Sequence, residues 1–243
     1  MSQHGKLLRA EEYKAAKTAL LHEIQIRTAH LRAIRAPESP DAQSKMLAEI
    51  DKFNLDRGRE LYFTYLGSGL GSGPYVELAD GSVKLDLIAG IGIQFFGHSH
   101  PDLMAEIVDS LGSDLMIGNL QPSQDASRLL AFVLSKVKGK SRLRHGWLTT
   151  CGTMANELAL KCIRQKRSPG TSVLAFEGCF AGRSTAMQEI TDNPKYREGQ
   201  PLFGQVEYVP FYEPDQSLRW NTDRTLSAMR VLLNRWPRRF CAF

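Results

Sequence analysis

The sequence predicts an α/β protein whose mostly parallel sheet is flanked by helices. From Trp147 onward, short β-type runs alternate with helical stretches, and such alternation is typical of a parallel sheet. These runs are Leu148–Thr150, the apolar Ser172–Phe176, and Val206–Val209. A segment of helices and a β-hairpin precedes them. We therefore predict an N-terminal segment at residues 1–86 and a large domain at residues 87–243.

The composition is that of a soluble globular protein. Hydrophobic residues make up 42% of the 243 residues and charged residues 23%. The net charge of +5 is spread along the chain except for a local excess at Arg235, Arg238 and Arg239, so nucleic acid is not an expected partner. Residues 1–10 lack an apolar signal core, and no apolar run reaches membrane-spanning length. We expect a cytoplasmic protein without a membrane partner.

Neither the cysteines nor the histidines show the spacing of a metal site. The four cysteines form no C-x-x-C pair, and no histidine-rich partner lies at zinc spacing. His98 and His100 are two residues apart, so they do not meet on one helix face. We expect reduced thiols, capping or turn roles for the two histidines, and no metal.

Several amphipathic stretches predict helices. The longest, Glu11–Arg35, carries apolar residues at helical spacing, and Pro37 and Pro40 are expected to end it. A second helix is predicted at Asp41–Phe53. Pro101 suits the first position of a further helix that extends to Leu111. The remaining predicted helices cover 127–136 and the region near 225–234.

A glycine-rich stretch and a hairpin signal lie between these helices. Gly67–Pro74 is interpreted as a flexible loop. Tyr75–Leu78 and Val83–Ile88 are joined by a turn sequence and predict a β-hairpin. The glycines overlap a dinucleotide-binding pattern, but they do not follow a strand and open a helix. Phosphate binding by this loop is therefore the minor alternative.

Cys151–Glu157 is predicted to form a turn that leads directly into a helix. A helix starting near Thr153 would bury one face, which carries Met154, Leu158 and Cys162 in one row and Ala155, Ala159 and Ile163 in another. Its first amides lack intrahelical acceptors, and the helix dipole adds partial positive charge. Gly152 allows the backbone to approach a ligand closely, and Thr153 adds a hydroxyl donor. Together these features predict an anion-binding site. Simple helix capping by Thr153 is the alternative.

Phe180–Arg183 follows the predicted strand Ser172–Phe176 within a tight loop. Ligands of α/β sheets collect at the carboxyl ends of the strands. Phe180 offers an aromatic face, and the small residues Ala181 and Gly182 leave room beside it for a planar ring. The alternative is that Phe180 fills the core.

Four blocks, in order, resemble one known family. Residues 151–161, CGTMANELALK, resemble the SGTEANEAALK block of class III aminotransferases, which use pyridoxal phosphate on fold type I. Residues 176–184, FEGCFAGRS, resemble the family's strand followed by F-H-G-R-S/T. Residues 86–101 are similar to its D-x-x-x-G-I…G-H-x-H-P block, and residues 118–122 to its S-N-L-Y-x-x-P segment. The resemblance covers about residue 62 to the end.

The resemblance implies a cofactor, partners and site residues. Gly152 and Thr153 would hold the phosphate of pyridoxal phosphate, and Phe180 beside Ala181 would stack on the pyridine ring. Asn119 would lie near the active-site mouth, close to a partner subunit, since family members are homodimers. The implied reaction moves an amino group from an amine or amino acid to a keto acid, with the cofactor as electron sink.

The chain departs from the family pattern at three points. Ala181 stands where the family usually has histidine, and Cys151 replaces a serine. The family's Schiff-base lysine and its acidic partner for the pyridine nitrogen lie downstream of the position that matches Phe243. This chain has no lysine after Lys195, so no catalytic residue is assigned and transamination by the 243 residues alone is not expected.

We therefore expect the N-terminal portion of such an enzyme, with an incomplete large domain. Residues 240–243 resemble the start of a buried strand, which supports this expectation. One alternative is another pyridoxal-phosphate activity on the same fold, such as an aminomutase or a racemase. The other is a non-catalytic binding protein derived from that fold.

Overall fold

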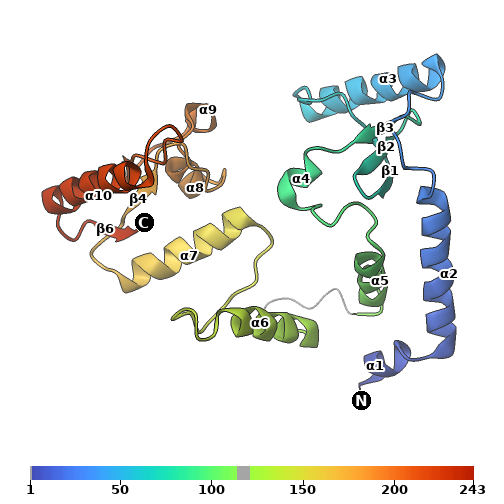
Figure 1. Cartoon of the computed structure of the whole chain (residues 1–243), viewed down its shortest axis with the longest axis horizontal. Helices are drawn as coiled ribbons and strands as arrows, with labels where there is room; N and C mark the ends of the chain where they lie inside the picture. Colours follow the sequence, from blue (N-terminus) through green and yellow to red (C-terminus); the bar gives the residue numbers. More distant parts are fainter. Residues whose placement is uncertain (1, 114–120) are drawn as a thin grey trace. The chain divides into compact units, whose positions relative to one another are not determined.

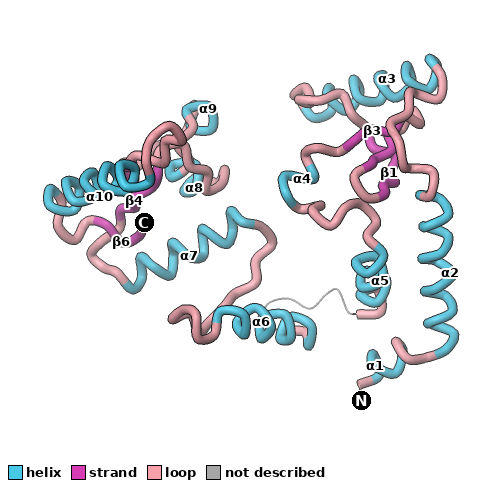
Figure 2. The backbone as a smooth tube through the Cα atoms, viewed as in Figure 1, coloured by secondary structure: helices cyan, strands magenta, loops and turns pink. Residues whose placement is uncertain are grey.

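Two separate three-stranded sheets organise the chain (Figures 1 and 2). The computed structural model describes residues 2–113 and 121–243. These residues belong to two units, Met1–Leu120 and Gln121–Phe243, which we call unit 1 and unit 2. The division falls later than the boundary predicted after Asp86. Among the described residues, no helix is both long and apolar enough to cross a membrane.

Unit 1 starts with three helices, of which the second is shorter than predicted. They are α1 (Gln3–Leu7), α2 (Glu11–Thr28) and α3 (Pro40–Arg57). The prediction extended α2 to Arg35 because Leu31 continued its apolar row. In the structure α2 ends at Thr28, and Arg35 forms an antiparallel bridge with Val83. Leu31 is only 1% exposed, but it is buried after the helix has ended.

The sheet of unit 1 corrects the prediction for the glycine-rich stretch. β1 (Gly67–Ser72) pairs antiparallel with β2 (Tyr75–Leu78), which pairs antiparallel with β3 (Val83–Leu85). The predicted hairpin is confirmed, but the predicted loop is a strand, so the phosphate-loop alternative loses its geometric basis. Gly71 allows a close approach, since a Cβ there would lie 2.7 Å from the Cβ of His98.

The segment after β3 is held by a carboxylate. Asp86 accepts hydrogen bonds from the amides of Ile88 and Ala89, and its Oδ2 lies 2.8 Å from Nε2 of His98. The short helix α4 (Ala89–Gly92) and then α5 (Pro101–Ser110) follow. His100 is the N-cap of α5 as predicted, but its side chain makes no capping hydrogen bond.

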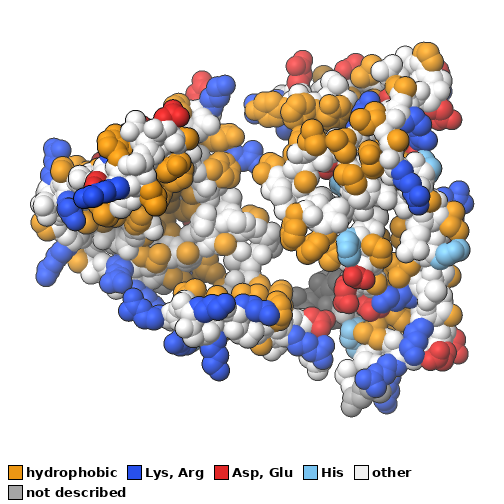
Figure 3. Space-filling model, in the orientation of Figure 1, with side chains coloured by type: hydrophobic (Ala, Val, Ile, Leu, Met, Phe, Trp, Pro, Cys, Tyr) orange, Lys and Arg blue, Asp and Glu red, His pale blue; other side chains and the backbone are white. Residues whose placement is uncertain are grey.

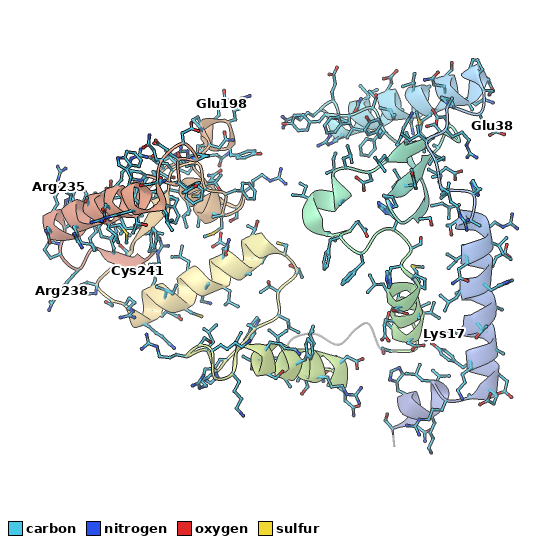
Figure 4. All side chains as sticks on the ribbon, in the orientation of Figure 1. Lys17, Glu38, Glu198, Arg235, Arg238 and Cys241 are labelled. Carbon is cyan, nitrogen blue, oxygen red and sulfur yellow. The ribbon has the colours of Figure 1, made fainter. Side chains whose placement is uncertain are left out.

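Unit 1 includes α5 because this helix packs on α2. The Tyr13 hydroxyl donates to the Val108 carbonyl at 3.0 Å, and Lys17 Nζ lies 2.7 Å from Asp109 Oδ2. Figure 4 labels Lys17, which points from α2 toward α5. These contacts join residues more than 90 positions apart, which explains why the observed division lies beyond Asp86.

Unit 2 has the predicted parallel sheet. Its elements are α6 (Gln124–Val137), α7 (Gly152–Lys166), β4 (Ser172–Phe176), α8 (Thr185–Ile190), α9 (Pro194–Arg197), β5 (Val206–Val209), α10 (Leu218–Arg235) and β6 (Phe240–Ala242). The strand order is β5-β4-β6, and both pairs are parallel. The predicted bounds of β4 and β5 are confirmed.

Two predictions for unit 2 are wrong. Residues 148–150 were expected to be a β-type run, but they lie outside regular structure; the Thr149 hydroxyl donates to the Cys151 carbonyl at 3.2 Å. The rows of α7 through Met154 and Ala155 were expected to be buried. Instead Met154 is 48% exposed, and Leu160 is the buried side chain of the helix.

The core of unit 2 explains which face of α7 is covered. Leu160 packs with Val173 of β4 and Met187 of α8, and all three are at most 6% exposed. Cys241 of β6, labelled in Figure 4, packs against the same cluster, as does Ala181. The sheet and α8 therefore meet α7 along the face of Leu160. The carboxyl end of β4 leads from this core directly to the loop of Phe180.

We predict that replacing Asp86 by asparagine removes a pH-dependent part of the stability. The hydrogen bond from His98 holds the pKa of Asp86 below its ordinary value. The stabilisation is thus fully present above the unfolded-state pKa of about 3.9 and is lost as the pH falls through the lower folded-state pKa. Urea unfolding at several pH values should show that the difference in the free energy of unfolding between the parent and Asp86→Asn becomes smaller below about pH 4.

Asp41→Asn is the matched control, because the side chain of Asp41 is 74% exposed. The difference in the free energy of unfolding between Asp41→Asn and the parent should depend less on pH. A gap between parent and Asp86→Asn that stays constant across the acid range would contradict the role given to Asp86.

Candidate functional site

The first turn of α7 leaves its backbone amides free. The N-cap is Cys151, whose side chain makes no capping hydrogen bond. In contrast, the serine N-caps of α3, α6, α8 and α10 each accept a backbone N–H. The first amide of α7 with an intrahelical acceptor is that of Ala155, which donates to the Cys151 carbonyl at 3.0 Å. Within the described residues, the amides of Gly152, Thr153 and Met154 have no acceptor.

The first turn of α7 has open space beside its first residue. The helix begins at Gly152, one residue earlier than predicted, and a Cβ on Gly152 would meet no atom within 4 Å. Thr153 therefore lies inside the helix and is not its N-cap, which removes the capping alternative. Free amides and the positive end of the helix dipole favour an anion at this position.

Thr153 also contacts the loop that follows β4. A Cβ built on Gly182 would lie 2.6 Å from Oγ1 of Thr153 and 3.0 Å from Cβ of Met187. Gly182 has φ +140°, a backbone conformation that L side chains rarely adopt. Only glycine permits this close approach without strain, so Gly182 brings the loop against the start of α7.

Two further contacts tie the loop to its surroundings. Asn156, one turn after Thr153, donates from Nδ2 to the Ala181 carbonyl at 2.8 Å. The Ala181 methyl packs against the core cluster of Leu160, Val173 and Met187. Ala181 therefore contributes to the candidate site through its backbone, while its side chain faces the core.

Phe180 presents its ring to solvent at the edge of this arrangement. Its side chain is 64% exposed, so the alternative of a core-filling role is wrong. The ring meets Tyr196 edge-to-face, with centroids 5.9 Å apart and planes at 70°. Since Phe180 directly precedes Ala181, its ring is held on the loop that contacts Thr153.

A half-buried phenol holds the end of the helix that follows the loop. The Tyr208 hydroxyl on β5 donates to the Glu189 carbonyl at 2.6 Å. Burial raises the pKa of Tyr208 to about 12, so the phenol stays a neutral donor at physiological pH. This hydrogen bond fixes the end of α8, which leads into Thr191.

The structure brings together four of the five predicted site residues. Gly152 and Thr153 open α7, and Phe180 and Ala181 form the adjoining loop. Asn119 lies outside the described residues. A hollow of about 370 Å³ in unit 1, between β1, β2 and α5, contains none of these residues. The described residues hold no group of three His, Cys, Asp or Glu arranged for a metal ion.

Sequence reasoning missed two residues that shape the site. Asn156 lies three positions after Thr153, and this spacing places both on one side of the helix. That signal was available from the sequence. Thr191 binds the Ala181–Gly182 backbone from ten positions away, and no local pattern marks it.

Comparison with known proteins identifies the family. The family model of class-III aminotransferases matches residues 66–243. The chain belongs to the class-III aminotransferase family. The match includes all of β1 to β6 and therefore both the first turn of α7 and the Phe180 loop.

Curated relatives and solved structures agree with this family. An acetylornithine aminotransferase of Xylella fastidiosa is 36% identical over 148 residues, which are 58% of this chain and 35% of the relative. One from Methanopyrus kandleri is 31% identical over 67% of this chain and 40% of its own length. An (S)-enantioselective omega-transaminase from Thermomicrobium roseum shares the fold, with a TM-score of 0.69 and 17% identity over 82% of this chain and 48% of its own. The chain thus spans about two fifths of its curated relatives.

We predict that Gly182→Ala destabilises unit 2 by about 1–3 kcal/mol, because the new Cβ meets Thr153 and the backbone conformation becomes strained. The free energy of unfolding in urea, followed by circular dichroism, measures the change. Gly152→Ala is the matched control, since a Cβ there has open space. Equal stability of Gly182→Ala and the parent would show that the contact between the loop and α7 is absent.

Proposed function

We propose that this chain binds pyridoxal phosphate in unit 2, with the phosphate at the start of α7 and the pyridine ring against Phe180. The observation that carries the proposal is the first turn of α7, where three consecutive amides lack acceptors among the described residues. Helix N-termini of this kind bind phosphate groups through backbone N–H donors. Membership of the class-III aminotransferases supplies the identity of the anion.

The residues present fit the parts of this cofactor. Gly152 leaves open space at the helix start, and Thr153 adds a hydroxyl whose oxygen makes no hydrogen bond within the described residues. The exposed ring of Phe180 offers an apolar face to a planar ring. Asn156 and Gly182 hold the loop against the helix, so both contacts belong to one rigid arrangement.

We further propose that the whole protein transfers an amino group from an amine or amino acid to a keto acid. This proposal rests on the family and on the acetylornithine aminotransferases that the chain resembles. When bound, pyridoxal phosphate serves as an electron sink for chemistry at the carbon that carries the amino group. The contribution of this chain's residues is to bind the phosphate, orient the ring and cover one side of it.

The binding proposal is tested by titrating the 243-residue chain with pyridoxal phosphate and following tryptophan fluorescence. We expect saturable binding that weakens about two- to tenfold in Phe180→Leu, because the aromatic face contributes about 0.5–1.5 kcal/mol. Pyridoxal, which lacks the phosphate, should bind far more weakly. Phe203→Leu is the control, since Phe203 is equally exposed, at 65%, but lies outside the loop.

No saturable binding by the parent chain would contradict the proposed cofactor site. Equal affinity for pyridoxal and pyridoxal phosphate would contradict the role of the free amides. Equal losses in Phe180→Leu and Phe203→Leu would contradict the role of Phe180.

We propose, finally, that the whole protein is a cytoplasmic homodimer. Apolar side chains near α4 support a contact with a second copy, because they are among the most exposed of unit 1: Leu87 at 85%, Ile91 at 92%, Ile93 at 78% and Phe95 at 73%. Figure 3 shows hydrophobic side chains over the part of unit 1 that carries α3 and α4.

We expect the chain to self-associate through this surface. Sedimentation equilibrium should give a species of twice 27.2 kDa, and Ile91→Ser should shift the equilibrium toward the monomer. A parent chain that stays monomeric at all concentrations would contradict the proposal. A dimer unaffected by Ile91→Ser would place the contact elsewhere.

A further inference from the structure

A single buried hydroxyl holds the backbone of the Phe180 loop. Thr191 follows α8 and is 1% exposed. Its Oγ1 accepts hydrogen bonds from the amide of Ala181 at 2.9 Å and from that of Gly182 at 3.2 Å. The same hydroxyl donates to the Gly182 carbonyl at 2.8 Å. One side chain thus satisfies three backbone groups of the loop.

These backbone groups lie between the two contacts proposed for the cofactor. Phe180 directly precedes Ala181, and Gly182 packs against the Thr153 side chain on α7. Asn156 reaches the same loop from α7 by donating to the Ala181 carbonyl. Any shift of the Ala181–Gly182 backbone therefore changes the position of the Phe180 ring relative to Thr153.

The next residue along the chain anchors the start of the loop. Oδ2 of Asp192 accepts from the Gly178 amide at 2.8 Å, and the Asp192 amide donates to the Cys179 carbonyl at 2.9 Å. Oδ1 of Asp192 is held by Arg197 at 2.9 Å. The loop is therefore fixed at its start by Asp192 and at its end by Thr191. Both anchoring residues belong to the short connection between α8 and α9, two helices that Figure 1 labels.

We propose that Thr191 is a positioning residue for cofactor binding. Its hydroxyl fixes the position of the Phe180 ring relative to the proposed phosphate-binding site at the start of α7. The inference rests on the proposed binding of pyridoxal phosphate. Thr191 acts through the loop backbone and is not expected to touch the cofactor, because its hydroxyl is fully engaged with Ala181 and Gly182.

The chemistry of the side chain decides which substitution is informative. Thr191→Val keeps the shape but leaves two amides and one carbonyl without a partner in a buried place, and the loop must move to satisfy them. Thr191→Ser keeps the hydroxyl and removes only a methyl group. Thr225→Val is the matched control, because the Thr225 hydroxyl donates to the Pro210 carbonyl in the same unit, away from the loop.

The first measurement is hydrogen exchange of the Ala181 and Gly182 amides in the full chain without cofactor. In Thr191→Val we expect exchange at least about tenfold faster, because both amides lose their acceptor. Thr191→Ser and Thr225→Val should exchange like the parent. Unchanged exchange in Thr191→Val would overturn the inference whether or not the chain binds the cofactor.

The second measurement is the affinity for pyridoxal phosphate. We expect Thr191→Val to bind about tenfold more weakly and Thr191→Ser to regain most of the loss. Thermal unfolding by circular dichroism confirms that each variant is folded, and Thr191→Ser keeps the test decisive if Thr191→Val does not fold. The inference would be overturned if a folded Thr191→Val variant bound pyridoxal phosphate as tightly as the parent. It would also be overturned if Thr191→Ser failed to restore binding.

The two measurements separate this inference from the proposal on which it rests. A parent chain that binds no pyridoxal phosphate would contradict the proposed function and with it the cofactor role of Thr191. A parent chain that binds, together with a Thr191→Val variant that exchanges rapidly but binds equally well, would overturn the positioning role alone.

Discussion

The contact between the first turn of α7 and the loop after β4 is the constraint on which the site depends. The turn leaves three amides without acceptors in the described chain, and the loop carries an exposed aromatic ring. Gly182 lets the two approach closely, because any side chain there would collide with Thr153. The core of Leu160, Val173 and Met187 lies beneath both and holds the helix and the sheet together.

A helix N-terminus whose backbone amides lack acceptors lowers the stability of a protein. Such termini occur at ligand sites, where the ligand supplies the missing acceptors. Among the described residues, five other helices use a serine N-cap to satisfy a backbone amide. Of the four described helices of ten or more residues whose N-cap is a serine or a cysteine, only α7 has a cap that makes no side-chain hydrogen bond. The family supplies a phosphorylated cofactor, and this terminus supplies donors that suit its charge.

Local sequence patterns predicted the elements whose residue types alone favour one secondary structure. β4 and β5 were found with their bounds because they are short runs rich in β-branched, aromatic and other apolar residues. The strand β1 was taken for a loop because its glycines have low strand propensity, and only pairing with β2 makes it a strand. Gly152 and Phe180 were found through the ordered resemblance, whereas Thr191 acts through hydrogen bonds that exist only once the loop has folded over α8.

The most direct test of the central claim follows the amide signals of a ¹⁵N-labelled chain by NMR while pyridoxal phosphate is added. The amides of Gly152, Thr153 and Met154 should shift most, because they would donate to the phosphate, and pyridoxal without the phosphate should leave them in place. Shifts confined to other parts of the chain, or equal shifts with pyridoxal, would contradict phosphate binding at the start of α7.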